Sequence, residues 1–171
     1  MKKYILYKNI DIDEVEKILD WIHETKEIPD RQLIICSLGG PYYLSHMVID
    51  ELNNNMNITV IAENIVYGGA FNIFMDSKNP KIVGPYFLSG MAFLANAKYL
   101  DISDLISKDP NTSLTAIQIK SFQRIHKWDI RKKSEYMSKE EIAILKKGEE
   151  VNLSRERVIE MAEIRNKKNK H

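Results

Sequence analysis

The chain has 171 residues, 44% of them hydrophobic and 29% charged, which is the composition of a folded globular protein with a substantial core. Its net charge of +1, from 25 basic and 24 acidic residues, argues against a strong electrostatic attraction to nucleic acid or to an anionic membrane. A single cysteine, Cys36, excludes an intrachain disulfide, and no apolar run approaches the length needed to span a bilayer. We therefore expect a cytoplasmic protein that binds neither nucleic acid nor membrane.

The first half of the chain alternates apolar runs of strand length with segments that have the helical period. Helices are expected after Asp11 or Asp13, after Pro41 and after Gly69, where apolar residues recur at helical spacing. Because strands and helices alternate over short connections, the pattern predicts crossover units around a mostly parallel sheet. The strands are expected at residues 4–7, 33–36, 58–62, 81–83 and 87–88.

Two Gly-Gly elbows, residues 37–41 and 66–71, each follow a strand run and open a helix. Glycine permits the sharp change of backbone direction, and a helix that begins at such a turn presents its first N–H groups. Two elbows side by side are expected to point these groups into one shared pocket. Such a pocket suits anions and the oxyanions that form in acyl transfer.

Beyond residue 100 the pattern becomes mainly helical. A long helix with an apolar face from Leu114 to Trp128 is expected, with basic residues on its other faces. A short helix through Ile142 and another through Val158 follow, and residues 165–171 are expected to form a basic tail that buries nothing. The N-terminal caps of these helices are expected at Thr112 or Ser113, at Ser138 with Glu141 as a capping box, and at Ser154.

The elbows and the C-terminal segment resemble motifs of one protein family. The first elbow resembles a Ser-Pro-Gly-Gly motif with Leu38 in place of the proline, residues 70–71 resemble the Ala-Phe that follows a nucleophile, and residues 153–160 resemble a Leu-Ser-x-x-Glu-Ala segment. On these motifs the chain is similar, from about residue 4 to 164, to the proteolytic subunit of the Clp protease (ClpP), in the crotonase-like superfamily. The resemblance implies an α/β fold of repeated β-β-α units with a projecting helical handle and C-terminal helices. It implies a single domain over residues 1–164, with the handle at about 93–135, and then the flexible tail at 165–171.

The family is a Ser-His-Asp peptidase, and the resemblance assigns its catalytic positions one residue at a time. The nucleophile position falls on Tyr67 and the base position on Ala92, while the acid position falls within residues 146–150, where Glu149 and Glu150 are the carboxylates. A phenol without a base is not an activated nucleophile, and alanine accepts no proton. No catalytic triad is therefore expected, although an oxyanion-hole remnant is implied. The residues that match this remnant are Gly39, Gly40 and Gly68.

Other residues offer weaker signs of chemistry. Ser37 and Ser89 lie near the elbows in the sequence, and His46 and His126 are the only bases that could serve them. A structural role is favoured for His46, on the helix that follows the first elbow, because triad geometry is demanding. His46 with Asp50 at i, i+4 gives two metal ligands without a third, so no metal site is expected. No phosphate-loop lysine follows either Gly-Gly pair, and no cofactor is expected.

The favoured hypothesis is a catalytically inactive ClpP-like subunit, a pseudoprotease with a structural or regulatory role in a Clp-type assembly. The resemblance implies stacked rings, either of this chain alone or mixed with an active ClpP, and a Clp ATPase as a further partner. Two alternatives stay open. One is an atypical ClpP-like serine peptidase or a crotonase-type enzyme, with Gly40 and Gly68 as oxyanion donors and Tyr67 as an acid. The other is an adaptor that inhibits or retunes an active ring.

Overall fold

The computed structural model describes residues 1–94 and 116–169, which divide into two compact units. The first unit combines Met1–Ala92 with the C-terminal segment from Asn152 onward, and the second unit is Phe93–Val151. Both elbows, the last helix and nearly all of the sheet belong to the first unit. Among the helices described in either unit, none combines the length and the apolar character that a membrane crossing requires.

The first unit is built on a six-stranded sheet with the strand order β1-β2-β3-β5-β6, in which β4 pairs with β3 beside this path. β1 pairs with β2, and β3 pairs with β2, β4 and β5, in every case in parallel. β3 is long enough to take two neighbours on one side, because β4 pairs with its first half and β5 with its last residues. The bounds of the strands are Lys2–Leu6 (β1), Arg31–Ser37 (β2), Ile58–Tyr67 (β3), Lys81–Val83 (β4), Ser89–Ala92 (β5) and Val151–Leu153 (β6).

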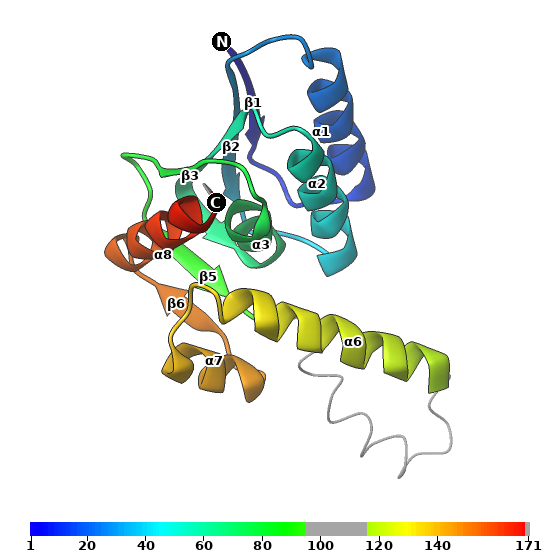
Figure 1. Ribbon diagram of the computed structural model, residues 1–171, viewed down its shortest axis with the longest axis vertical. Helices are drawn as coiled ribbons and strands as arrows, with labels where there is room; N and C mark the ends of the chain where they lie inside the picture. Colours follow the sequence, from blue (N-terminus) through cyan, green and yellow to red (C-terminus); the bar gives the residue numbers. More distant parts are fainter. Residues whose placement is uncertain (95–115, 170–171) are drawn as a thin grey trace. The chain divides into compact units, whose positions relative to one another are not determined.

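Helices α1, α2 and α3 lie together on one face of this sheet (Figure 1). The side chain of Asp11 caps α1 by accepting a hydrogen bond from the Glu14 N–H at 2.8 Å, as its position before the apolar pattern predicts. α8 contacts α3, β4 and β5, so the two ends of the first unit's sequence meet in one core. The bounds are Ile12–Glu24 (α1), Tyr42–Asn54 (α2), Gly68–Asp76 (α3) and Arg155–Lys168 (α8).

The core of the first unit lies between the sheet and these helices. Burial alternates along β2, where Leu33 and Ile35 are fully buried and Ile34 between them is partly exposed. α3 is buried at every position, in accordance with its almost wholly apolar sequence. Each large aliphatic or aromatic side chain placed in this core contributes about 1.5–3 kcal/mol through removal of apolar surface from water.

The other face of the sheet carries four isoleucines in one row. The strand register pairs Ile5 with Ile34, Ile34 with Ile61, and Ile61 with Ile82, so the row crosses β1, β2, β3 and β4. Ile5 is 52% exposed and Ile82 is 51% exposed, while the two central members are partly buried. We call these four residues the isoleucine row.

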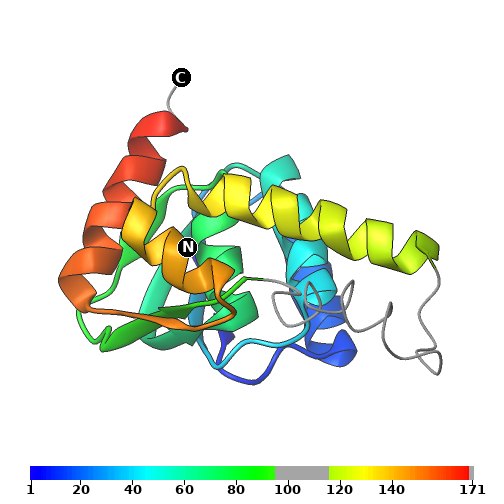
Figure 2. The ribbon, with the colours of Figure 1, turned by 90° about the horizontal axis from the view of Figure 1, so that it is seen from below.

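The second unit contains α6 (Ala116–Lys133) and α7 (Lys139–Lys146), which are joined by a tight turn (Figure 2). Ser138 and Glu141 form the expected capping box at the start of α7, with both reciprocal hydrogen bonds present. Within α6, the ammonium of Lys133 pairs with the carboxylate of Asp129 four residues earlier, and both side chains are buried. A charge is stable at such a depth only when an opposite charge or several hydrogen bonds accompany it.

Most of the predicted elements agree with the structure in type, and they differ at some boundaries. β3 extends to Tyr67 instead of ending at residue 62. The strand expected at residues 87–88 is wrong: the Leu88 N–H donates to the Asn64 carbonyl outside the ladder, and the strand lies at Ser89–Ala92 (β5). α8 extends to Lys168, so residues 165–168, expected in the tail, are helical. The caps expected at 112 or 113, and the expected helix start at 114, lie outside the described residues.

Candidate functional site

The candidate site lies at the edge of the sheet where β2, β3 and β5 end. The first elbow continues β2 into α2, and the second continues β3 directly into α3 at Gly68. The pairing of β2 with β3 is irregular between Ile35 and Ser37, which pair with Ala62 and Val66. Asn64, in the irregular part of β3, has a positive φ of 53°. This bulge adds two residues to β3 before the second elbow, because the two steps from Ile35 to Ser37 stand opposite the four steps from Ala62 to Val66. Bulges commonly redirect side chains beside functional sites.

The two elbows are in direct backbone contact. A Cβ placed on Gly39 would lie 2.5 Å from the Tyr67 carbonyl oxygen and 2.7 Å from the Gly69 nitrogen. Gly39 also has a φ of +91°, which side chains of L-residues rarely adopt. A Cβ on Gly69 would lie 2.2 Å from the Ser45 hydroxyl. Glycine is therefore required at both positions, by backbone conformation at the first and by close packing at the second.

Hydrogen bonds fix the first elbow to the loop that follows β1. The Ser37 hydroxyl donates to the Lys8 carbonyl at 2.5 Å and accepts from the Gly39 N–H at 3.0 Å. The Ile10 N–H in turn donates to the Gly39 carbonyl at 2.9 Å. The amide of Gly39 is thus already used within the elbow. Of the glycines expected to match an oxyanion hole, Gly40 and Gly68 stay as candidate donors.

A pair of hydroxyl groups lies at this edge, one from Tyr67 of the second elbow and one from Ser89 of β5. The Tyr67 hydroxyl and the Ser89 hydroxyl are 2.8 Å apart, and either one can be the donor. β3 and β5 pair Tyr67 with Met91, so the next residue of β5, Ala92, lies beside the start of α3 at Gly68. Ala92 is fully buried and offers only a methyl group. The edge therefore holds a phenol, an alcohol and backbone amides, with no base from β5.

The histidines considered in the sequence occupy separate places. The His46 ring lies against the Tyr42 ring on α2, with 4.3 Å between the centroids. Asp50, four residues after His46 on α2, is exposed. His126 is buried on α6, in the second unit. Within the described part of the chain, no three histidine, cysteine or acidic side chains are grouped closely enough to bind a metal ion.

The remaining predicted residues are placed as follows. Glu149 and Glu150 are exposed and precede β6 in the second unit. Cys36 is partly buried near the end of β2. Sequence reasoning did not pair Tyr67 with Ser89, because that contact depends on the β3–β5 register. It also did not identify Gly69 as a contact glycine, although the Gly-Gly pair was a usable signal.

Solved structures with this fold are known. ClpP1 from Listeria monocytogenes matches with a TM-score of 0.66 at 15% sequence identity, over 94% of this chain and 86% of that chain. A single-site mutant of the same protein matches with a TM-score of 0.64 at 16% identity, over the same shares. No protein-family model matches the sequence, and no curated protein does. Matches at this identity describe backbone architecture, so we conclude that the chain has a ClpP-like α/β fold.

Proposed function

We propose that the chain is a catalytically inactive ClpP-like subunit with a structural or regulatory role in a Clp-type assembly. One observation carries the proposal: Tyr67 stands at the position that the resemblance gives to the nucleophile, and Ala92 at the position of the base. The Tyr67 hydroxyl engages Ser89, and Ala92 has no atom that accepts a proton. Alcohols and phenols stay protonated near neutral pH unless a base is placed beside them, so acyl transfer at this edge lacks its nucleophile.

The isoleucine row supports a role in assembly. Parallel sheets are almost always covered on both faces, and here α1, α2 and α3 lie together on the face opposite the isoleucine row. Ile5 and Ile82, at the two ends of the row, are each about half exposed. An apolar strip of this kind marks an interaction face. A second copy of the chain, or an active proteolytic subunit, would bury it. If the strip meets a different surface of its neighbour, the repeated contact gives a ring when its rotation closes.

A fluorophosphonate probe tests the inactive state, because it labels only serines that a neighbouring base activates. Purified protein incubated with the probe is expected to show no adduct by intact mass, while an active ClpP treated in parallel is labelled. Hydrolysis of fluorogenic peptides is expected to stay at the level of buffer. Labelling of Ser37, Ser89 or another serine would overturn the proposal in favour of an atypical peptidase.

Native mass spectrometry tests the assembly. At micromolar concentration we expect a closed oligomer, or complexes with the host's active ClpP or Clp ATPase when either is added. Mixed complexes with altered peptidase activity would identify a regulatory subunit, and homomeric rings a structural one. A chain that stays monomeric and captures neither partner would refute the role in a Clp-type assembly.

A further inference from the structure

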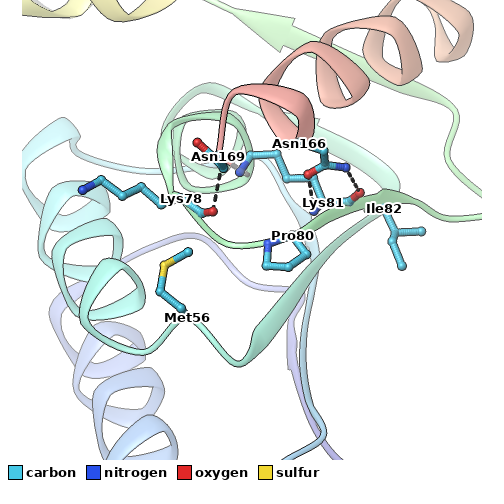
Figure 3. Close-up of a pocket in the computed structure, with 7 residues that line it drawn as sticks. All are labelled: Met56, Lys78, Pro80, Lys81, Ile82, Asn166 and Asn169. Carbon is cyan, nitrogen blue, oxygen red and sulfur yellow. Dashed lines mark hydrogen bonds between the residues drawn. The ribbon is translucent and has the colours of Figure 1, made fainter. Parts of the chain in front are cut away.

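A pocket of about 360 Å³ opens beside β4, away from the elbows (Figure 3). Lys81, the first residue of β4, pairs with Val60, and Tyr67 lies seven residues further along β3. At 3.3 Å per residue that separation is about 23 Å, so the pocket is distinct from the candidate site. Its lining consists of two lysines, two asparagines and three apolar residues, with no carboxylate among them.

Asn166 of α8 and Asn169, which directly follows this helix, fix one wall of the pocket. Asn166 accepts a hydrogen bond from the Lys81 N–H at 2.9 Å and donates to the Lys81 carbonyl at 2.8 Å, so its side chain takes the place of a neighbouring strand (Figure 3). Asn169 donates to the Lys78 carbonyl at 2.8 Å. Both amides are thus oriented before any ligand arrives. A pre-organised wall lowers the entropy that binding must overcome.

The side chain of Lys81 is 96% buried and runs from β4 toward Asn169 (Figure 3). Its amine donates to the Ser77 carbonyl at 2.5 Å and to the Asn79 carbonyl at 2.8 Å. A protonated lysine has three N–H donors, so these carbonyls use two of them. Among the described residues, the third has no acceptor.

The charges around Lys81 do not favour its ammonium. Burial is the main cause that lowers the pKa of Lys81, to about 7, and the positive charge of Arg165 on α8 lowers it further, while Asp76 on α3 opposes both. Lys78, which is exposed at the rim of the pocket, adds a further positive charge. The amine beside the pocket is therefore only partly protonated near neutral pH. An anion in the pocket would favour the protonated form.

We propose that this pocket binds a monocarboxylate with a short aliphatic chain, whose carboxylate accepts the third N–H of the Lys81 ammonium. The aliphatic part would lie against Met56, Pro80 and Ile82, which form the apolar part of the lining. One buried amine matches one negative charge. The volume is near the lower end of the roughly 300–1,000 Å³ found for small-molecule sites, which suits a small ligand. The carboxylate can belong to a free acid or to the C-terminus of a peptide that ends in an aliphatic residue.

Binding should take up a proton at Lys81, and calorimetry with hexanoate measures this. The protonated fraction of a group with a pKa of about 7 falls roughly 25-fold between pH 6.5 and 8.5, so hexanoate should bind up to about 25-fold more weakly at pH 8.5. Hexanol, which has the same chain without the charge, should not bind measurably at either pH. Equal affinity for hexanoate at both pH values, or no saturable binding at all, would overturn the proposal.

Substitutions and amide spectra locate the site. The Lys81→Met variant should lose hexanoate binding, while Lys78→Met at the rim should weaken it only two- to threefold. In ¹H–¹⁵N spectra of the unmodified protein, hexanoate should shift the side-chain amides of Asn166 and Asn169. If Lys81→Met does not fold, the amide shifts and the pH dependence of binding, both measured on the unmodified protein, decide whether hexanoate binds in this pocket. Binding that moves neither amide, or that survives in a folded Lys81→Met variant, would place the ligand elsewhere.

A peptide distinguishes the two sources of the carboxylate. Ala-Ala-Leu with a free C-terminus should bind more tightly than hexanoate if the pocket serves peptide ends, and more weakly if it serves free acids. The same peptide with an amidated C-terminus should not bind in either case. Equal binding of the free and amidated peptides would contradict recognition by Lys81. None of these outcomes depends on whether the chain assembles with Clp proteins or labels with a fluorophosphonate.

Discussion

Arg165 connects the last helix of the chain to the end of α3, because its Nε donates to the Met75 carbonyl at 3.0 Å. A second nitrogen of the guanidinium donates to the Asp76 carbonyl at 3.4 Å. The last carbonyls of a helix have no intrahelical donors, and a side chain that is 3% exposed here supplies them. α8 is thereby attached to the buried helix that begins at the second elbow.

Replacement of Arg165 with methionine should lower the free energy of unfolding by about 2–4 kcal/mol, because buried carbonyls lose charged donors. Lys167→Met is the matched control, since Lys167 is exposed on the same helix and its substitution should change stability by no more than about 0.5 kcal/mol. Urea unfolding followed by circular dichroism measures both. Equal stability of the two variants would show that the Arg165 contacts do not hold α8.

The buried amine of Lys81 predicts a stability that depends on pH. The pKa of Lys81 is about 7 in the folded chain and 10.5 by the reference value, so between these values the unfolded chain binds more protons. Stability should therefore rise with pH across this window, by up to about 1.4 kcal/mol per unit, and lose that gain as the pH falls toward 7.

Urea unfolding at pH 7.5, 8.5 and 9.5 measures the free energy of unfolding of the unmodified chain and of the Lys81→Met variant, and the comparison tests this pH dependence. The unmodified chain should gain stability relative to the variant at each step, because the variant has no amine to titrate at this place. Lys78→Met, which removes an exposed lysine from the same pocket, should follow the unmodified chain. Parallel curves for the unmodified chain and Lys81→Met would mean that the Lys81 pKa is not lowered.

Features that depend on a few neighbouring residues could be predicted from the sequence. The caps at Asp11, Ser138 and Ser154 form as expected. Each cap needs only a side-chain oxygen that accepts a hydrogen bond from the backbone N–H three residues later. The elbows at Gly39 and Gly68 were also predictable, since glycine after an apolar run marks the change from strand to helix.

Features that depend on distant partners could not be predicted. The bulge at Asn64 exists only relative to β2, and so the length of β3 was underestimated. Lys81 and Arg165 are charged residues that sequence patterns place at the surface, and each is buried because carbonyls near the end of α3 accept its N–H groups. The contact of Tyr67 with Ser89 likewise requires the register of two strands 22 positions apart.

The contact between the elbows predicts that Gly39→Ala is poorly tolerated. The substitution forces a left-handed backbone onto alanine and places a Cβ 2.5 Å from the Tyr67 carbonyl, so a loss of about 3 kcal/mol or more is expected. Gly148→Ala, also at positive φ, should cost about 1 kcal/mol from backbone conformation. Thermal unfolding of both variants separates the cost of the left-handed backbone from the cost of the steric contact between the elbows. Similar losses would mean that steric contact between the elbows contributes little.

Restoring the two missing catalytic residues should not restore a protease. In Tyr67→Ser with Ala92→His, the serine and the base regain the positions that the resemblance gives them, but no acid has been supplied to orient the imidazole. The loss of that group alone lowers turnover about 10⁴-fold in serine proteases, so labelling by a fluorophosphonate should be at least about 1,000-fold slower than in an active ClpP. Tyr67→Ser alone is the control. Rapid labelling of the double variant would reveal a carboxylate already placed beside the site.

The isoleucine row predicts an assembly that a single charge disrupts. Ile61 lies in the middle of the row on β3, between Ile34 and Ile82. In Ile61→Lys, an ammonium on this face can extend into water in the separate chain but would be buried without a partner in an interface. Native mass spectrometry should therefore show dissociation, with an unchanged circular dichroism spectrum. Glu16→Lys, on the exposed side of α1, should leave the assembly intact. An oligomer that persists in Ile61→Lys would mean that the chain assembles through another face.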